Sequence, residues 1–191
     1  MAALTPLAKI PQEVAASHSP DNHHQAMLPT LRPTCKAMEC LFLWKGMNSP
    51  PLSIIDSPVI AHIQAIASQA SLPDTGNYGA GLRKYHLFCN IFSIPEKNRL
   101  PASFATLHSF MLWVASDPEI VGQSPMPDTP LEPVSVSTAR KYLAAIRAWH
   151  IAQGWPPPLA EDQMSQINWS LRGLENLNYK EHGTDGPYTR R

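Results

Sequence analysis

The side chains with the clearest chemical role in this sequence are basic, and they lie in residues 135–153, which read SVSTARKYLAAIRAWHIAQ. This segment contains no acidic residue. At about 100° per residue along a helix, its apolar residues share one face, whereas Ser137 and Lys141 lie on the other face with Arg147 beside it. Small residues between Lys and Arg would let the helix lie close to a phosphate backbone. A basic face that is only solvated would have the same pattern.

A metal site is the second chemistry to consider, because His23, His24, Cys35 and Cys40 form the only candidate ligand set. Their spacing in a proline-rich region matches no common zinc arrangement. We therefore expect no bound metal and no cofactor. With Cys89 the chain has three cysteines, an odd and sparse set that argues against a disulfide framework and favours a reducing intracellular compartment.

The motifs of common enzymes are missing from the sequence, which contains no glycine-rich phosphate loop, no GxSxG elbow and no HExxH pair. The adjacent acids Glu161 and Asp162 head a predicted helix, where negative charge interacts favourably with the helix dipole. They are therefore expected to cap a helix rather than to form a catalytic pair. We expect no catalytic residue and no small-molecule substrate.

Helices must position the basic residues, and proline, glycine and N-cap signals divide the chain after residue 57 into helical segments. Ser135, Ser137 or Thr138 can each cap the segment that carries the basic face. The predicted helices span about residues 58–71, 75–92, 103–116, 135–153 and 162–178. Their expected core positions are Ile60, Ile63 and Ile66; Tyr78, Leu82, Tyr85 and Cys89; Leu107, Phe110, Met111 and Val114; Ala139, Tyr142, Leu143, Ile146, Trp149 and His150; and Met164, Ile167, Leu171 and Leu174.

Several glycines and histidines in these helices are compatible with two roles, packing in the core or contact with a ligand. Gly76, Gly79 and Gly81 each cost a helix up to about 1 kcal/mol relative to Ala, so something should compensate. We expect close helix–helix contact, with close approach of a ligand as the alternative. His86 and His150 lie on or beside apolar faces and are expected in the core rather than at a metal.

The composition limits the fold and the partners. Lys+Arg and Asp+Glu are both 15, so the whole-chain charge does not attract nucleic acid or an anionic membrane. No apolar run approaches the roughly 20 residues of a membrane span, and the N-terminus has no secretory pattern. The 20 prolines argue against long strands. We expect an all-α fold, with a compact bundle of four to five short helices in residues 58–178, a disordered or loosely structured extension in residues 1–57 and a tail in residues 179–191. A short helix around residues 34–45 is the alternative for part of the extension.

The succession of helices resembles a known domain. Residues 58–177 are similar to the N-terminal core-binding, SAM-like domain of tyrosine recombinases of the phage-integrase family, especially the Cre-like versions of fungal mobile elements. The resemblance rests on TGNYGAGLRKYHLFC (75–89), LPASFATLHSFMLWV (100–114), STARKYLAAIRAWH (137–150) and INWSLRGLENL (167–177).

The resemblance implies a DNA-binding role, because in that family this domain is half of a C-shaped clamp around duplex DNA. The second and fourth helices of that domain approach the major groove. In this chain they correspond to residues 75–92 and 135–153. On the last helix, Arg172 matches a basic position that the family uses toward the DNA backbone. The positions after it are Gly173, Glu175 and Asn176, where Cre-like relatives are basic, which implies fewer phosphate contacts. By position, the DNA-contacting candidates are Asn77, Arg83, Lys84, Ser137, Thr138, Lys141, Arg147 and Arg172.

The catalytic residues of the family, an Arg, a Lys, a His-x-x-Arg pair and a Tyr, belong to a second domain that this sequence lacks. Tyr179 and Tyr188 follow no His-x-x-Arg pair. The leading hypothesis is a non-catalytic module that binds duplex DNA. We expect it to form a homo-oligomer or to bind a recombinase, and to be nuclear if the source is a eukaryote. The alternatives are a helical protein–protein interaction module that has lost DNA binding, and a fragment of a complete recombinase that acts in DNA integration and recombination.

Overall fold

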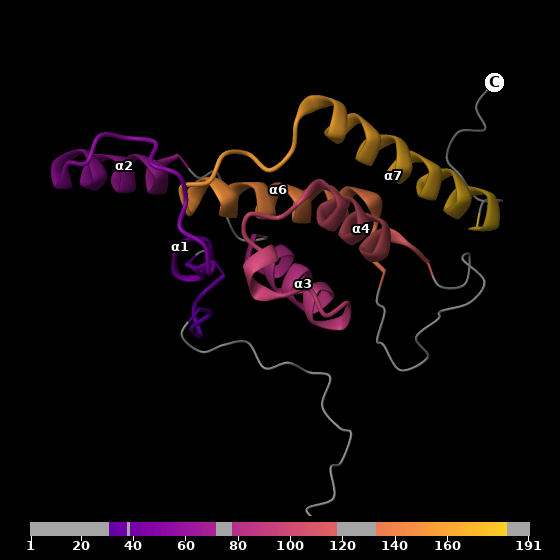
Figure 1. The fold of residues 1–191 in the computed structure, drawn as a ribbon. Helices are drawn as coiled ribbons and strands as arrows, with labels where there is room; N and C mark the ends of the chain where they lie inside the picture. The colour runs from indigo at the N-terminus through magenta and orange to yellow at the C-terminus, as the bar shows by residue number, and fades with distance from the viewer. Residues whose placement is uncertain (1–30, 38, 72–77, 118–132, 183–191) are drawn as a thin grey trace, which may run out of the picture.

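The computed structural model describes residues 31–37, 39–71, 78–117 and 133–182, with side chains as far as residue 178. These residues contain helices and no strand, so the predicted all-α fold is confirmed (Figure 1). The helices are α1 (Cys40–Leu43), α2 (Pro58–Ala70), α3 (Tyr78–Ile91), α4 (Phe104–Ala115), α6 (Val136–Ala152) and α7 (Glu161–His182), with a 3-10 turn η1 (Glu96–Asn98).

Serine side chains cap the N-termini of two of these helices, α4 and α6. The Ser103 hydroxyl accepts a hydrogen bond of 3.1 Å from the Thr106 N–H at the start of α4, and the Ser135 hydroxyl accepts one of 3.2 Å from the Thr138 N–H at the start of α6. Each satisfies an amide that has no partner within the helix. The predicted N-cap at Asp162 is wrong, because α7 begins one residue earlier and Asp162 lies within its first turn.

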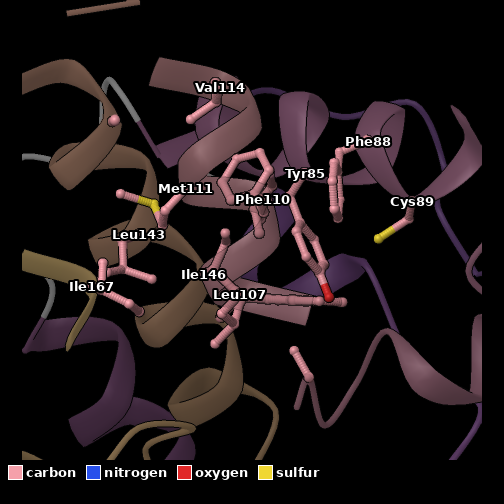
Figure 2. Packing of buried hydrophobic residues seen from close by; sticks show 14 of the residues in the cluster. Tyr85, Phe88, Cys89, Leu107, Phe110, Met111, Val114, Leu143, Ile146 and Ile167 are labelled. Carbon is pink, nitrogen blue, oxygen red and sulfur yellow. The ribbon is translucent and has the colours of Figure 1, made fainter. Parts of the chain in front are cut away.

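The core lies between α3, α4, α6 and α7, and α6 contacts each of the other three (Figure 2). The stripe predicted for α4 is fully buried. The stripes of α3 and α6 are also buried, except that Tyr78 and Tyr142 are partly exposed. Among the α7 side chains that the structure describes, up to residue 178, only Ile167 and Leu171 are fully buried, because this helix covers one side of the bundle.

The glycines of α3 permit close contact, as predicted. A Cβ atom on Gly81 would lie 2.9 Å from Cα of Tyr142 on α6. A Cβ atom on Gly79 would lie 2.6 Å from Cα of Ala37. Both positions are therefore occupied by neighbouring backbone rather than open to a ligand. Gly76 lies outside the described residues.

Residues 31–44 differ from the loosely attached extension expected for residues 1–57, because they belong to the core. Cys40, Leu41 and Trp44 are buried. The Gln153 side chain donates a hydrogen bond of 2.6 Å to the Leu41 carbonyl from the end of α6. The apolar run CLFLW supplies this contact, although the surrounding composition is that of a loop.

Helix α2 forms where it was predicted, but its predicted core stripe is wrong. It has no buried residue, and Val59, Ile63 and Ile66 are each more than half exposed. Figure 1 shows α2 outside the bundle. The reason is that no other helix of the described residues packs closely along α2, whereas α1 packs on α3 and α6.

Candidate nucleic-acid interface

Helices α3 and α6, which were both expected to contact DNA, pack directly against each other. They approach each other closely at Gly81, which lies against Tyr142 and Ala145. Neither helix contains an acidic residue. Together they carry five basic side chains, on Arg83, Lys84, Arg140, Lys141 and Arg147.

The first two turns of α6 contain three of the predicted contact residues, Ser137, Thr138 and Lys141, together with Arg140. Ser137, Arg140 and Lys141 are all exposed. Thr138 is half-buried, and its hydroxyl lies 3.0 Å from the Ser135 hydroxyl in the N-cap. Ser137 and Lys141 are therefore better placed than Thr138 to contact a ligand.

Arg147 lies two turns further along α6 and is half-buried. Its Nε is buried and has no hydrogen-bond partner among the described residues. A buried donor without a partner costs about 1–3 kcal/mol. The structure therefore gives Arg147 a different environment from that of the exposed Lys141.

The two basic residues of α3 contact different neighbours. Arg83 is exposed, and its Nη2 lies 3.5 Å from the Cys35 carbonyl, beside α1. Lys84 is half-buried, and its Nζ lies 5.5 Å from the ring centroid of Trp113 on α4. Arg83 is thus available at the surface, whereas Lys84 has a packing role in the bundle. Asn77 lies outside the described residues.

Arg172 lies on a third element, α7, and is exposed. Helix α7 packs on α4 and α6, so Arg172 is not part of the α3–α6 pair. Trp169 precedes it by three residues on the same helix face and is 78 % exposed. Sequence reasoning missed this tryptophan, although its offset from the stripe of Ile167 and Leu171 indicates exposure.

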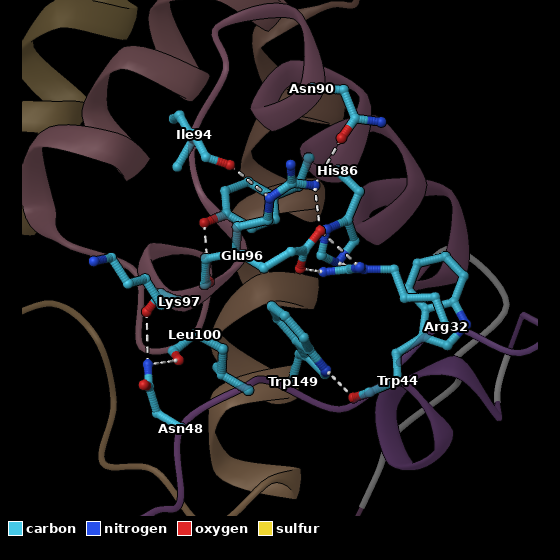
Figure 3. A network of polar contacts seen from close by, with 12 residues as sticks. Arg32, Trp44, Asn48, His86, Asn90, Ile94, Glu96, Lys97, Leu100 and Trp149 are labelled. Atoms are coloured by element: carbon cyan, nitrogen blue, oxygen red, sulfur yellow. Dashed lines mark hydrogen bonds and ion pairs between the residues drawn. The ribbon is translucent and has the colours of Figure 1, made fainter. Parts of the chain in front are cut away.

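A cluster of buried charges lies elsewhere in the molecule and has a structural role (Figure 3). Glu96 pairs with both Arg32 and Arg99, and the Arg32 Nε donates a hydrogen bond of 3.1 Å to Nε2 of His86. Burial, reinforced by the two guanidinium charges, holds the pKa of His86 well below its ordinary value. This neutral histidine and the ion pairs join the segment before α1 to α3 and η1. Sequence reasoning missed Arg32 because it lies in the predicted extension.

The second buried histidine, His150, is also part of the core, as predicted. Its Nε2 accepts a hydrogen bond of 2.9 Å from the Ala102 N–H, so its Nδ1 carries the proton donated to the Ile146 carbonyl at 2.8 Å. Burial lowers the pKa of His150 to about 4. Both ring nitrogens are used within the protein, which leaves none for a metal.

The ligand set considered from the sequence is not assembled in the described part of the chain. Residues 31–182, apart from their gaps, contain no group of three or more His, Cys, Asp or Glu side chains that could hold a metal ion. His23 and His24 lie outside the described residues. No helix of the described residues has both the length and the apolar character required to cross a bilayer.

Comparisons with known proteins found no matching family model, no matching curated protein and no matching solved structure. The resemblance to tyrosine recombinases therefore stays a prediction from the sequence.

Proposed function

We propose that this chain is a non-catalytic module that binds duplex DNA in the manner of the core-binding domain of tyrosine recombinases. The observation that carries the proposal is the direct contact between α3 and α6, two helices that together hold five basic residues and no acidic one. Of the five, Arg83, Arg140 and Lys141 are exposed. This local charge supports phosphate binding although the net charge of the chain is zero.

The contacts differ in kind along the two helices. The guanidinium and ammonium groups of Arg83, Arg140 and Lys141 are suited to phosphate oxygens, and the Ser137 hydroxyl can donate a hydrogen bond close to the positive end of the α6 dipole. Each phosphate that is neutralised contributes about 0.9 to the slope of log K against log salt. Three exposed cations therefore predict a slope of roughly −3, which describes moderate rather than tight binding.

The test is titration of a fluorescent duplex with the protein at several salt concentrations. We expect Arg83→Ala combined with Lys141→Ala to weaken binding and to lower the salt slope by about 2. Lys97→Ala is the matched control, because Lys97 is an exposed lysine of η1 and belongs to neither α3 nor α6. Equal binding by the double variant and the control would refute the proposed face.

The proposal includes the absence of strand cleavage, since the sequence has no His-x-x-Arg pair. Any cutting of DNA would then belong to a recombinase partner. Incubation with a supercoiled plasmid followed by protease treatment checks this point, because a covalent tyrosyl–DNA link or nicked product formed by the chain alone would overturn it.

The second candidate is a protein–protein interaction module, which the exposed apolar face of α2 favours. Val59, Ile63 and Ile66 are exposed by 66 %, 56 % and 55 %, and α2 carries no Lys, Arg, Asp or Glu. Because α2 has no charged residue that would repel a second copy, the Val59, Ile63 and Ile66 side chains of two copies could pack against each other. Sedimentation equilibrium over a range of concentrations tests the self-association form of this candidate: Ile63→Asp should abolish self-association, and a wild-type chain that stays monomeric would exclude self-association through α2.

A further inference from the structure

Two of the three cysteines lie in direct contact. The Cys35 Sγ is 2.9 Å from the Cys40 Sγ, about 0.9 Å longer than a disulfide bond of roughly 2.05 Å. The two thiols differ in access, because Cys35 is half-buried whereas Cys40 is fully buried at the start of α1. Cys89 is buried on α3.

Other groups around the pair favour thiol chemistry. The Cys40 thiol donates a hydrogen bond of 3.3 Å to the Lys36 carbonyl, which keeps it beside Cys35. The Arg83 guanidinium lies against the Cys35 carbonyl at 3.5 Å. The charge of Arg83 favours the thiolate form of Cys40, which is the form that reacts with disulfides, although burial acts more strongly in the opposite direction.

We propose that Cys35 and Cys40 form an oxidation-sensitive dithiol whose co-substrate is a low-molecular-weight disulfide of the glutathione type. The half-buried Cys35 is the attacking thiol, and the buried Cys40 is the resolving thiol. The proposal does not depend on DNA binding by this chain.

The step balances as two thiol–disulfide exchanges. The Cys35 thiolate attacks one sulfur of oxidised glutathione, forms a mixed disulfide and releases one glutathione thiolate. The Cys40 thiolate then attacks the Cys35 sulfur, closes the disulfide and releases the second glutathione thiolate. The two protons lost by the cysteines end on the two glutathiones, so that one oxidised glutathione is reduced to two thiols as the cysteine pair is oxidised.

The environment of Cys40 is compatible with this order. Burial raises the pKa of Cys40 to about 12, and the hydrogen bond and charge of Cys35 add to the effect, whereas Arg83 lowers it. The effect of Cys35 disappears once Cys35 is in a mixed disulfide, so Cys40 becomes easier to deprotonate at the resolving step. Burial likewise raises the pKa of Cys89 to about 12. Cys89 is buried like Cys40, but it is Cys40 and not Cys89 that lies against Cys35, so Cys89 is the unreactive reference within the same chain.

Closure of the disulfide would fix the first residue of α1. The other end of α1 is already held by the hydrogen bond from Trp149 to the Trp44 carbonyl. The oxidised form should consequently hold residues 35–44 more firmly to α6 and unfold at a higher temperature than the reduced form.

The experiment treats the reduced full chain with oxidised glutathione, blocks the remaining thiols, denatures the chain and digests it with trypsin. Cleavage after Lys36 separates the two cysteines into peptides 10–36 and 37–45, and Cys89 falls in peptide 85–97. We expect the first two peptides to be joined by a disulfide, two of the three thiols to be lost, and dithiothreitol to restore both. Lack of the linked peptides, or oxidation of Cys89 to the same extent, would overturn the proposal.

Two variants separate the roles of the pair. Cys40→Ser should trap a stable glutathione adduct on Cys35, because the resolving thiol is gone while the serine hydroxyl can still donate to the Lys36 carbonyl. Cys35→Ser should gain no adduct, since both remaining thiols are buried. Cys89→Ala is the matched control and should form the disulfide as the wild type does. A lasting glutathione adduct on the wild-type chain would also contradict the proposal, because it would show that Cys40 does not resolve it.

Discussion

The indole Nε1 of Trp149 donates a buried hydrogen bond of 2.8 Å to the backbone carbonyl of Trp44, 105 residues earlier in the chain. This bond joins α6, at the centre of the bundle, to the segment that contains α1. The Trp149 ring also meets the rings of Tyr85 and His86 edge to face, at 6.4 Å and 5.2 Å between centroids. The segment that contains α1 is therefore part of the folded core.

Trp149→Phe should lower the free energy of unfolding by about 2–4 kcal/mol, because it leaves the Trp44 carbonyl without its donor and creates a cavity. Urea unfolding followed by circular dichroism measures the change. Trp169→Phe is the matched control: Trp169 is 78 % exposed, so its replacement should change stability by less than about 0.5 kcal/mol. Similar losses for both variants would contradict the central place of Trp149.

Gly81→Ala should destabilise the protein by about 1–3 kcal/mol, because the new Cβ would lie 2.9 Å from Cα of Tyr142. This cost exceeds the gain in helix propensity of up to about 1 kcal/mol. Gly173→Ala is the control, since nothing lies within 4 Å of a Cβ at that position of α7. It should stabilise the protein by up to about 1 kcal/mol. Changes of the same sign in the two thermal unfolding curves would contradict the close packing of α3 on α6.

Stability should fall as the pH is lowered from about 6.5 toward about 4, the pKa to which burial lowers His150. The folded state binds fewer protons at this histidine than the unfolded state, so acid favours unfolding. His86, whose pKa is also lowered, acts in the same direction. We expect a loss of about 1–2 kcal/mol from His150 between pH 7 and 5.

Urea unfolding at several pH values checks this dependence. His62→Gln should leave the slope unchanged, because His62 is exposed on α2. His150→Gln should reduce the slope, even where its stability at neutral pH is lower. A stability that stays constant between pH 7 and 5 would disprove the neutral state assigned to the buried histidines.

Glu96→Gln should cost about 3 kcal/mol or more, because it removes the anion shared by Arg32 and Arg99 and leaves two buried cations. Glu175→Gln is the matched control on the exposed surface of α7 and should have an effect of less than about 0.5 kcal/mol. The comparison is made by urea unfolding at neutral pH. If Glu96→Gln were as mild as the control, the ion pairs would contribute nothing to the attachment of Arg32.

Much of the bundle could be predicted from local patterns. The buried stripe of α4 depends only on residues a few positions apart, so the sequence contains the information. The burial of Leu41 depends on α6, more than a hundred residues later, and no local pattern reports it. Conversely, the isoleucines of α2 show helical periodicity, but periodicity cannot tell whether another element is there to cover them.

The same distinction applies to the candidate site. The absence of acids and the position of Lys141 on the outer face of its helix could be predicted from spacing alone. The sequence could not predict that the Thr138 hydroxyl takes part in the N-cap, because Ser135, Ser137 and Thr138 were all suitable N-cap residues. The position of Lys84 over Trp113 required the tertiary packing of α3 on α4, which no pattern within one helix contains.

This difference between neighbouring basic residues leads to the last prediction. Arg83→Gln should weaken duplex binding and leave stability unchanged, because Arg83 is exposed and its hydrogen bond to the Cys35 carbonyl is long, at 3.5 Å. Lys84→Gln should lower stability by about 0.5–1 kcal/mol through loss of the contact with Trp113. Fluorescence titration of a duplex and urea unfolding, measured on both variants, separate the two effects. Should Lys84→Gln reduce duplex affinity more than Arg83→Gln at unchanged stability, the DNA-facing flank of α3 would be the one toward α4 rather than the one toward α1.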